Sequence, residues 1–590
     1  MSRNIFSYSA VIASLLATAL FAGCGTSNKE GNLSAADVAK VEETACAQCH
    51  STAIDHIAGT PIYDAYLQSA HFTNNFRVVG CQDCHGGGAQ HNGVGPLPYP
   101  NPDAAGKCFE CHEKYLPTNH FASYTAAAHP GQYVSTNYKN SCTSCHDPHL
   151  AQNGILNGEI NTVTGLPKGT EHTDWAESGH GEVDGEAWAH YDFKLRDNCN
   201  RCHTSTGYIT YVSSNYAYPV PAWGTAGDKT NEVLTCKACH TDYNFKNRIR
   251  RAGAFSAPFN GNKNPIAFPD SGTSNLCIAC HSGYESGGAI GGFTGTLTAL
   301  TGDMDTKSAV NSHYLAAAAL FYGKSAFHFY TSNVKYDTGY NTGKNFGTWS
   351  HGRLGMIDPA TNQPYVASGV STGEDGPCVA CHLGSVNGNT KTHTLSASET
   401  WNAQGRCFGC HSNFAAEGGV DAVIEEEKEL FDRGLDFYLF TLANHNIGNK
   451  TPIYYDVTTY PYFHKSLPAK RGTTDFKTWT MGTADSTIGK QVMGVAFNYN
   501  LINREKGAHV HNRAYTRRLM FDGIQYLQKG ANTYSTSTGS IGGTADPNAQ
   551  LSFTGYSTAV AAGTRPANPV SISTLKGWLL RSSGGLYYRR

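Results

Sequence analysis

Cysteine and histidine are the residues of this chain whose number and spacing point most directly to chemistry. The 590 residues include 19 cysteines and 26 histidines. The pattern Cys-x-x-Cys-His occurs nine times, and Cys24 alone stands outside it. The paired cysteines are Cys46 with Cys49, Cys81 with Cys84, Cys108 with Cys111, Cys142 with Cys145, Cys199 with Cys202, Cys236 with Cys239, Cys277 with Cys280, Cys378 with Cys381, and Cys407 with Cys410.

Cysteines in such numbers suggest disulfides, zinc sites or haem attachment. Disulfides would suit an exported chain, and zinc binds both cysteine and histidine, yet neither requires a histidine after every second cysteine. In c-type haem attachment the two thiols form thioethers with the porphyrin vinyl groups, and the adjacent histidine binds the iron. The pattern therefore predicts nine covalently attached c-type haems. Their expected proximal ligands are His50, His85, His112, His146, His203, His240, His281, His382 and His411.

The second axial position of each haem distinguishes electron transfer from catalysis. An electron carrier has both axial positions filled, whereas a catalytic haem keeps one open for substrate. The chain has 6 methionines including Met1, so most second ligands of closed sites must be histidines. Seventeen histidines lie outside the motifs, which is more than nine closed sites require. About half of them would then be exposed or hydrogen-bonded imidazoles.

Nine of these histidines are candidate distal ligands. Six stand among small residues or shortly before a motif, where a haem can approach: His71, His129, His180, His190, His351 and His393. His149 resembles the last position of the CxxCHxPH pattern of multihaem cytochromes, and His91 trails the glycine-rich run after His85 in a similar variant. His511, followed by Asn512, resembles a His-Asn element of pentahaem nitrite reductases and octahaem families. These resemblances imply distal ligation by His91, His149 and His511.

The density of motifs limits the kind of fold. From Cys46 to His411 there are about 40 residues for each haem, far fewer than the roughly 100 residues of an ordinary single-core domain. The haems must then supply much of the apolar core. Runs rich in glycine and proline favour loops and short helices. We predict a mostly irregular fold with α-helices and little sheet, in which a multihaem cytochrome c wraps around a haem chain and ends in a helical C-terminal region.

Motif positions divide the chain into segments. We expect a signal peptide at 1–23, a lipid-anchored tether at 24–45, a seven-haem region at 46–281, a haem-free insertion at 282–377 that could donate ligands, a two-haem segment at 378–411, and a helical haem-free region at 412–590. In the last segment Phe431, Leu435, Tyr438 and Leu442 recur at helical spacing, and a second such stretch follows Tyr515.

The N-terminus has the features of an export signal. One positive charge precedes an apolar run from Ile5 to Phe21, too short for a spanning helix with these flanks. The run that ends in Cys24 resembles a bacterial lipoprotein signal, which implies a lipid on Cys24 and, because Gly25 follows, an outer-membrane destination. The alternative is an ordinary signal peptide that happens to precede a cysteine.

Overall charge excludes one class of partner. With 44 Lys and Arg against 46 Asp and Glu, the net charge is -2, and no basic stripe suggests nucleic-acid binding. Charged residues make up 15% of the chain, which also argues against a charge-driven disordered protein.

Taken together, the nine motifs, the lipoprotein-like signal and the haem density resemble the outer-membrane multihaem c-type cytochromes of metal-respiring bacteria. The resemblance implies an electron-transfer protein without catalytic residues, on the cell surface or the periplasmic face of the outer membrane. The implied partners are other multihaem cytochromes, a porin-cytochrome conduit, and an extracellular metal oxide or another acceptor.

Two other functions stay open. One is a multihaem reductase of a small nitrogen or sulfur oxyanion with one open haem, although no motif has the Cys-x-x-Cys-Lys form that nitrite reductases use at the active haem. The other is a subunit of a conductive cytochrome filament, which a lipid anchor would disfavour.

Overall fold

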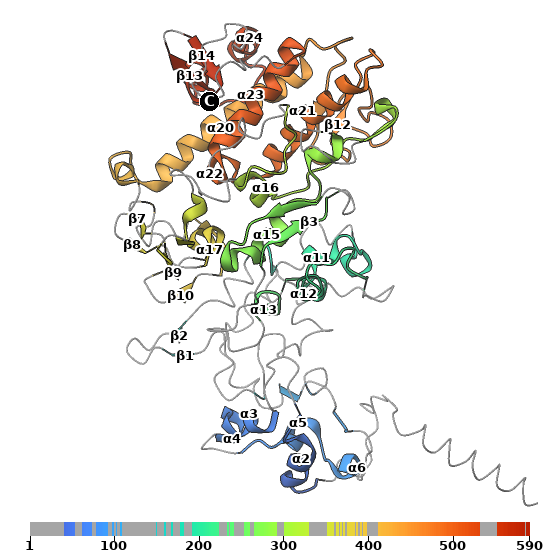
Figure 1. Cartoon of the computed structure of the whole chain (residues 1–590), viewed down its shortest axis with the longest axis vertical. Coiled ribbons are helices and arrows are strands. Elements are labelled where there is room, and N and C mark those ends of the chain that lie inside the picture. Colours follow the sequence, from blue (N-terminus) through green and yellow to red (C-terminus); the bar gives the residue numbers. More distant parts are fainter. Residues whose placement is uncertain are drawn as a thin grey trace, which may run out of the picture. The chain divides into compact units, whose positions relative to one another are not determined.

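A computed structural model gives the fold of this chain (Figure 1). It describes residues 40–53, 62–73, 78–92, 97–99, 102, 107–108, 149, 159–160, 167–168, 178–181, 191–222, 233–234, 236–240, 250, 253–259, 265–291, 300–329, 351–358, 361–364, 366–367, 370–371, 375–383, 385–386, 390–391, 393–397, 407, 411–531, 551–583 and 586–589.

The chain forms two compact units. Unit 1 comprises Met1–Ser213, Val220–Arg250 and Lys391–Leu395, and unit 2 comprises Ser214–Pro219, Arg251–Thr390 and Ser396–Arg590.

Sheet is scarce in the described part of the chain, where every strand belongs to a two-stranded ribbon. The strands are β1 (Glu159–Ile160), β2 (Pro167–Lys168), β3 (Phe255–Ala257), β4 (Ile266–Phe268), β5 (Ile357–Asp358), β6 (Gln363–Pro364), β7 (Val366–Ala367), β8 (Val370–Ser371), β9 (Ser385–Val386), β10 (Thr390–Lys391), β11 (Tyr454–Tyr455), β12 (Phe463–His464), β13 (Leu580–Ser583) and β14 (Leu586–Arg589). The predicted fold class, mostly irregular with α-helices and little sheet, is confirmed for these residues.

Unit 1 contains short helices joined by irregular segments. They are α2 (Glu43–His50), α3 (Ile62–Gln68), α4 (Ala70–Thr73), α5 (Cys81–His85), α6 (Ala89–Asn92), η2 (Phe193–Leu195), α11 (Asn200–His203), α12 (Ser205–Ser213) and α13 (Cys236–Cys239). Carboxylates that accept hydrogen bonds from backbone N–H groups define where α5 begins. At α5, the Gly80 N–H donates to Asp83 at 2.9 Å, and the Cys81 N–H donates to Glu43 at 3.2 Å.

Unit 2 contains both short motif-bearing helices and longer ones. The shorter elements are η3 (Gly272–Ser274), α15 (Asn275–His281), η4 (Gly287–Ile290), η5 (Met304–Thr306), α16 (Ala317–Phe321), η7 (His351–Arg353), α17 (Pro377–His382) and η8 (Ser412–Ala415). The remaining helices are α20 (Val420–Ala443), α21 (Ser486–Arg504), α22 (Ala508–His511), α23 (Arg513–Lys529), α24 (Thr554–Ala561) and α25 (Ile572–Leu579).

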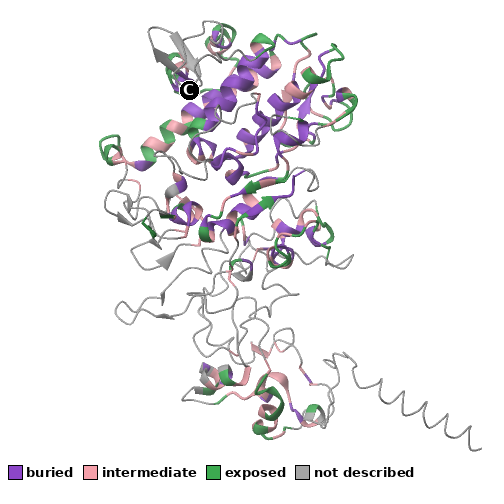
Figure 2. Ribbon diagram, in the orientation of Figure 1, coloured by how far each residue is buried: buried purple, intermediate pink, exposed green. Residues whose placement is uncertain are grey.

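The long helices of unit 2 enclose a hydrophobic core made of protein side chains. Helices α20, α21 and α23 contact one another, and in the described part of the chain long stretches of these helices are buried (Figure 2). Close helix approach depends on glycine, because a Cβ at Gly523 of α23 would overlap the Tyr438 hydroxyl of α20. That hydroxyl donates to the Val495 carbonyl of α21 at 2.9 Å. The three helices are therefore fixed against one another.

Side-chain caps fix the starts of two of these helices. Asp485 accepts a hydrogen bond from the Thr487 N–H at the start of α21, at 2.8 Å. Asn512 accepts one from the Tyr515 N–H at the start of α23, at 3.1 Å, and donates to the Phe321 carbonyl at 3.0 Å. Such caps satisfy backbone donors that the helix itself leaves unpaired. Among the described residues, no helix combines the length and hydrophobicity that a membrane span needs.

Candidate haem sites

The described Cys-x-x-Cys-His motifs lie on or directly beside short helices in both units. Five motifs are described with all their side chains, at α2, α5, α11, α15 and α17, and the backbone of a sixth is described at α13. Residues i, i+3 and i+4 of a helix share one face. In α2, α5, α15 and α17, which contain both cysteines and the histidine of their motif, these three residues therefore project to the same side of the helix, as attachment of a single haem requires.

Five motif histidines each lie opposite a predicted distal histidine. The ring centroids are separated by 6.2 Å for His50 and His91, 6.3 Å for His85 and His149, 6.4 Å for His240 and His393, 6.2 Å for His411 and His351, and 6.1 Å for His382 and His511. Each pair lies within one unit, the first three in unit 1 and the last two in unit 2.

These separations match the spacing of two imidazoles that ligate one metal ion from opposite sides. A bond between a transition metal and an imidazole nitrogen is about 2 Å long. With each ring centroid about 1.1 Å behind its nitrogen, the centroids of opposed ligands lie about 6.2 Å apart. Direct stacking contact would bring the rings closer, as with Phe193 and His203 at 4.0 Å. The residues present thus fit an iron held between two histidines.

Hydrogen bonds at Nδ1 orient the rings of three histidines, of which two belong to the pairs above. The Nδ1 of His85 donates to the Tyr99 carbonyl at 3.1 Å, and the Nδ1 of His281 donates to the Leu315 carbonyl at 3.0 Å. The Nδ1 of His511 lies 3.1 Å from Oε1 of Glu505. A protonated and hydrogen-bonded Nδ1 fixes the tautomer in which Nε2 is the nitrogen that can bind a metal.

Burial keeps two of these histidines in the form that binds metal. It lowers the pKa of His351 to about 4, with the nearby His411 and His511 adding to the effect. Burial, followed by the neighbouring His149, also lowers the pKa of His85. A metal ligand must be the neutral imidazole, and both shifts favour the neutral form near neutral pH.

The pKa values of His511 and Glu505 are shifted by each other, that of His511 upward and that of Glu505 downward. Burial alone would lower the pKa of His511, but its hydrogen bond to Glu505 and the charge of that carboxylate outweigh burial and raise it. Burial alone would raise the pKa of Glu505, and the hydrogen bond and charge of His511 outweigh it and lower that pKa. Glu505 is therefore held as a buried carboxylate.

Comparison with known proteins supports the haem interpretation. The chain is 25% identical to the C-type polyheme cytochrome OmcB of Geobacter sulfurreducens, found in strains PCA and DL-1, over 90% of this chain and 95% of that protein. It is 24% identical to the C-type polyheme cytochrome OmcC of strain PCA, with the same coverage. The chain is a homologue of multihaem c-type cytochromes. No protein-family model and no solved structure matches it.

The relationship covers nearly all of this cytochrome homologue, including both units. It implies covalently bound c-type haems and an electron-transfer role. The alignment with OmcB spans 748 positions, more than the 590 residues present here, so OmcB has segments that this chain lacks.

In the described part of the chain, two pairs of Cys-x-x-Cys-His motifs are neighbours. The sulfur atoms of Cys46 and Cys81 and a carboxylate oxygen of Glu43 lie within 4.8 Å of one another. Burial, and next Glu43, raise the pKa of Cys81 to about 12. In unit 2 a hydrogen bond with Cys277 lowers the pKa of Cys378. Each of these four cysteines is the first of its motif, so adjacent attachment sites meet at equivalent positions.

Two histidines outside the predicted ligand set form hydrogen bonds with other protein groups through both ring nitrogens. His445 donates from Nε2 to the Thr451 carbonyl at 2.8 Å and accepts at Nδ1 from the Ile447 N–H at 3.1 Å. His464, which is fully buried, has Nδ1 at 3.0 Å from Thr474 Oγ1 and Nε2 at 3.0 Å from the Thr459 carbonyl. With both ring nitrogens bonded to protein groups, these two histidines stabilise the helical core.

The remaining predicted site residues divide into two groups. His71 lies in α4 and His180 in the turn at 178–181, outside the five pairs above. Other predictions concern residues outside the described part of the chain: Cys24, Cys111, His112, His129, Cys142, Cys145, His146, His190 and Cys410.

Glu505 was not predicted by the sequence analysis. Its position six residues before His511 has no periodic meaning, so only the turn between α21 and α22 reveals the contact.

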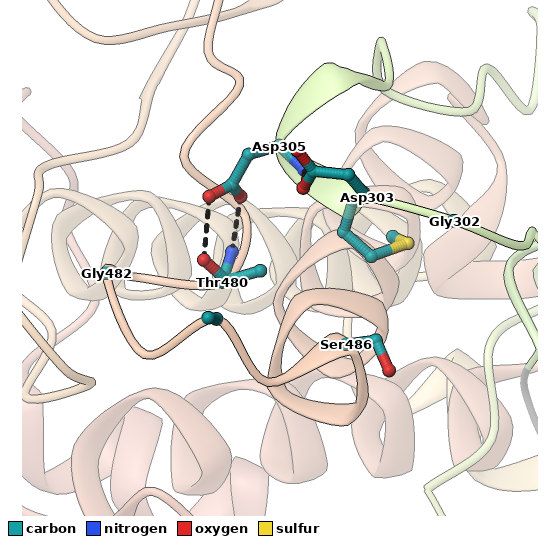
Figure 3. A pocket seen from close by; sticks show the side chains of 8 residues that line it. Gly302, Asp303, Asp305, Thr480, Gly482 and Ser486 are labelled. Carbon is teal, nitrogen blue, oxygen red and sulfur yellow. Dashed lines mark hydrogen bonds between the residues drawn. The ribbon is translucent and has the colours of Figure 1, made fainter.

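A cavity of about 460 Å³ lies in unit 2, away from every described motif residue. It is lined by Gly302, Asp303, Met304, Asp305, Thr480, Gly482, Ala484 and Ser486. Asp305 accepts hydrogen bonds from the backbone N–H and the hydroxyl of Thr480, at 2.8 and 2.7 Å (Figure 3). Its lining includes neither cysteine nor histidine, so this cavity has none of the groups that attach a haem covalently, and Met304 is its one side chain of a type that can ligate haem iron.

Proposed function

We propose that this chain is a nonahaem c-type cytochrome that carries electrons across or outside the outer membrane in anaerobic, extracellular respiration. The observation that carries the proposal is the set of five histidine pairs with centroids 6.1 to 6.4 Å apart. Each pair combines a motif histidine with a histidine from elsewhere in the chain. Two histidines on one iron leave no position for substrate, which suits an electron carrier and disfavours a reductase.

We propose specific ligands for these five sites. The second ligands are His91 for the motif at Cys46, His149 for Cys81, His393 for Cys236, His511 for Cys378 and His351 for Cys407. The other four candidates, His71, His129, His180 and His190, remain for the four other motifs. When bound, c-type haem supplies one-electron chemistry at its iron.

The chain's own residues have three tasks in this function. The paired cysteines hold each group covalently, the paired histidines close both axial positions, and Nδ1 hydrogen bonds keep the rings aligned. Neighbouring attachment sites, such as those at Cys46 and Cys81, support short distances between successive centres. Short distances are what a chain of electron carriers requires.

The proposed location follows from the N-terminal sequence. A lipid on Cys24 would anchor the chain to the outer membrane, with residues 25–45 as a tether. The proposed partners are other multihaem cytochromes, a porin-cytochrome conduit, and a metal oxide or another extracellular acceptor.

Counting high-spin haems in the oxidised, purified holoprotein by electron paramagnetic resonance tests this function. We expect nine haems per chain and a wholly low-spin spectrum. A high-spin component that shifts when nitrite or hydroxylamine is added would favour a reductase instead. Long unbranched polymers in shed material would favour a filament subunit.

A further inference from the structure

Glu505 lies in the turn between α21 and α22 and is buried beside His511. Its side chain is 3% exposed, and its Oε1 lies 3.1 Å from Nδ1 of His511. The same oxygen accepts the Gly507 N–H at 2.9 Å. One carboxylate oxygen thus connects the backbone of the turn to the imidazole that faces His382.

The turn leaves space for the contact between Glu505 and His511. A Cβ at Gly507 would lie 2.6 Å from Cε1 of His511 and 3.1 Å from Oε1 of Glu505. The approach below 3.0 Å would force the imidazole to move, so glycine is needed for space at this position. Backbone bonds from Ala508 to Glu505, at 3.0 Å, and from His511 to Gly507, at 2.8 Å, close the turn. Glu505 and His511 therefore form one rigid unit.

The second carboxylate oxygen of Glu505 accepts no hydrogen bond from a described residue. Oε2 of Glu505 is buried and has no hydrogen-bond partner in the described structure. A charge in a buried, weakly polar environment interacts more strongly with its surroundings than the same charge in water. At His85, by contrast, Nδ1 donates to the neutral carbonyl of Tyr99.

We propose that Glu505 is a positioning residue that fixes His511 as the distal ligand of the haem at Cys378 and lowers the reduction potential of that haem. This inference rests on the proposed ligation by His382 and His511. A carboxylate that accepts the Nδ1 proton makes imidazole a stronger donor to the metal. A stronger donor and a nearby negative charge both favour ferric over ferrous iron, which is the direction of a lower potential.

Three variants of the full-length holoprotein separate charge from geometry. Glu505→Gln keeps the size of the side chain and an oxygen that accepts from His511, but removes the charge. Glu505→Ala removes the acceptor as well. Asp436→Asn is the control, because Asp436 is another poorly exposed carboxylate of unit 2 that binds Tyr556 and Arg565 and not a motif residue.

A redox titration monitored by electron paramagnetic resonance measures the midpoint potential and the spin state of the haems. We expect one midpoint potential to move upward in Glu505→Gln while every haem stays low-spin. Glu505→Ala should shift the same midpoint further and produce a high-spin fraction of one haem, because His511 is no longer held. All midpoints should stay unchanged in Asp436→Asn.

Failure of this inference is distinguishable from failure of the proposed function. If Glu505→Gln binds its full set of low-spin haems and no midpoint moves, Glu505 has no such role, and the proposed function stands. If His511→Ala leaves the haem at Cys378 low-spin, the ligand assignment itself is wrong. Glu505→Gln is nearly isosteric, so the test does not depend on the folding of the alanine variant.

Discussion

The imidazole rings of His382 and His511 lie with centroids 6.1 Å apart and planes tilted by 47°, although one residue ends α17 and the other ends α22. The first belongs to a haem-attachment motif, and the second is held by Glu505 in the turn after α21. The proximity of these two rings connects α17, which bears a motif, to the helical core of unit 2. The helical region after His411 has no motif, yet through His511 it completes a candidate haem site.

Loss of a second ligand should change the spin state of one haem. We expect His351→Ala to convert one haem to the high-spin form, because His351 is the histidine opposite His411. Electron paramagnetic resonance of the oxidised protein measures this change. The matched control is His464→Ala, which removes a buried histidine whose ring nitrogens both contact protein groups.

The control variant, His464→Ala, should lower the stability of the protein instead. Removing the hydrogen bonds of a buried group costs about 1–3 kcal/mol, so His464→Ala should lower the urea midpoint with no new high-spin signal. A high-spin haem in His464→Ala, or none in His351→Ala, would contradict the assignment.

The orientation of paired rings should be visible in spectra. The ring planes of His85 and His149 differ by 7°, whereas those of His351 and His411 differ by 75°. In ferric haems with two imidazoles, near-parallel ligand planes give a rhombic low-spin signal and near-perpendicular planes a highly anisotropic one. His149→Ala should therefore remove a rhombic component and His351→Ala a highly anisotropic one. The reverse assignment would contradict the described geometry.

Each motif should attach one haem independently of the others. Replacing both Cys46 and Cys49 with alanine should lower the haem content from nine to eight per chain, as measured by mass spectrometry and iron analysis. Cys24→Ala is the control, since Cys24 lies outside the motifs and should leave the count unchanged. An unchanged haem content in the double variant would show that the motif binds no haem.

Cys24 should determine membrane attachment. If it carries the lipid, Cys24→Ala should move the protein from the membrane fraction to the soluble fraction with its haems intact. Immunoblots of the separated fractions measure the distribution. Retention of the variant in the membrane fraction would count against the lipid anchor.

Two helix caps should differ in their effect on the haems. Asp485→Ala and Asn512→Ala each remove an N-cap, so each should lower the free energy of unfolding by about 1 kcal/mol. Asn512 directly follows His511 and also donates to the Phe321 carbonyl. We therefore expect Asn512→Ala, and not Asp485→Ala, to perturb the spectrum of one haem. Equal spectra in both variants would show that the cap does not support the ligand.

The sequence by itself was enough to predict where haem attaches, because the chemistry of attachment is local. Two cysteines and a histidine at i, i+3 and i+4 share a helix face whatever surrounds them, so the motif at Cys277 could be identified without a fold. Scarce sheet also followed from local composition, since glycine and proline interrupt regular strands.

Only the tertiary structure decided which spare histidine faces which motif. His393 lies opposite His240 and His511 opposite His382, while His445 and His464 bond to backbone and hydroxyl groups of the core. No periodicity distinguishes these residues, because each contact joins parts of the chain that meet only through packing. For the same reason the carboxylate of Glu505, which holds His511, could be found only once α21 and α22 were placed.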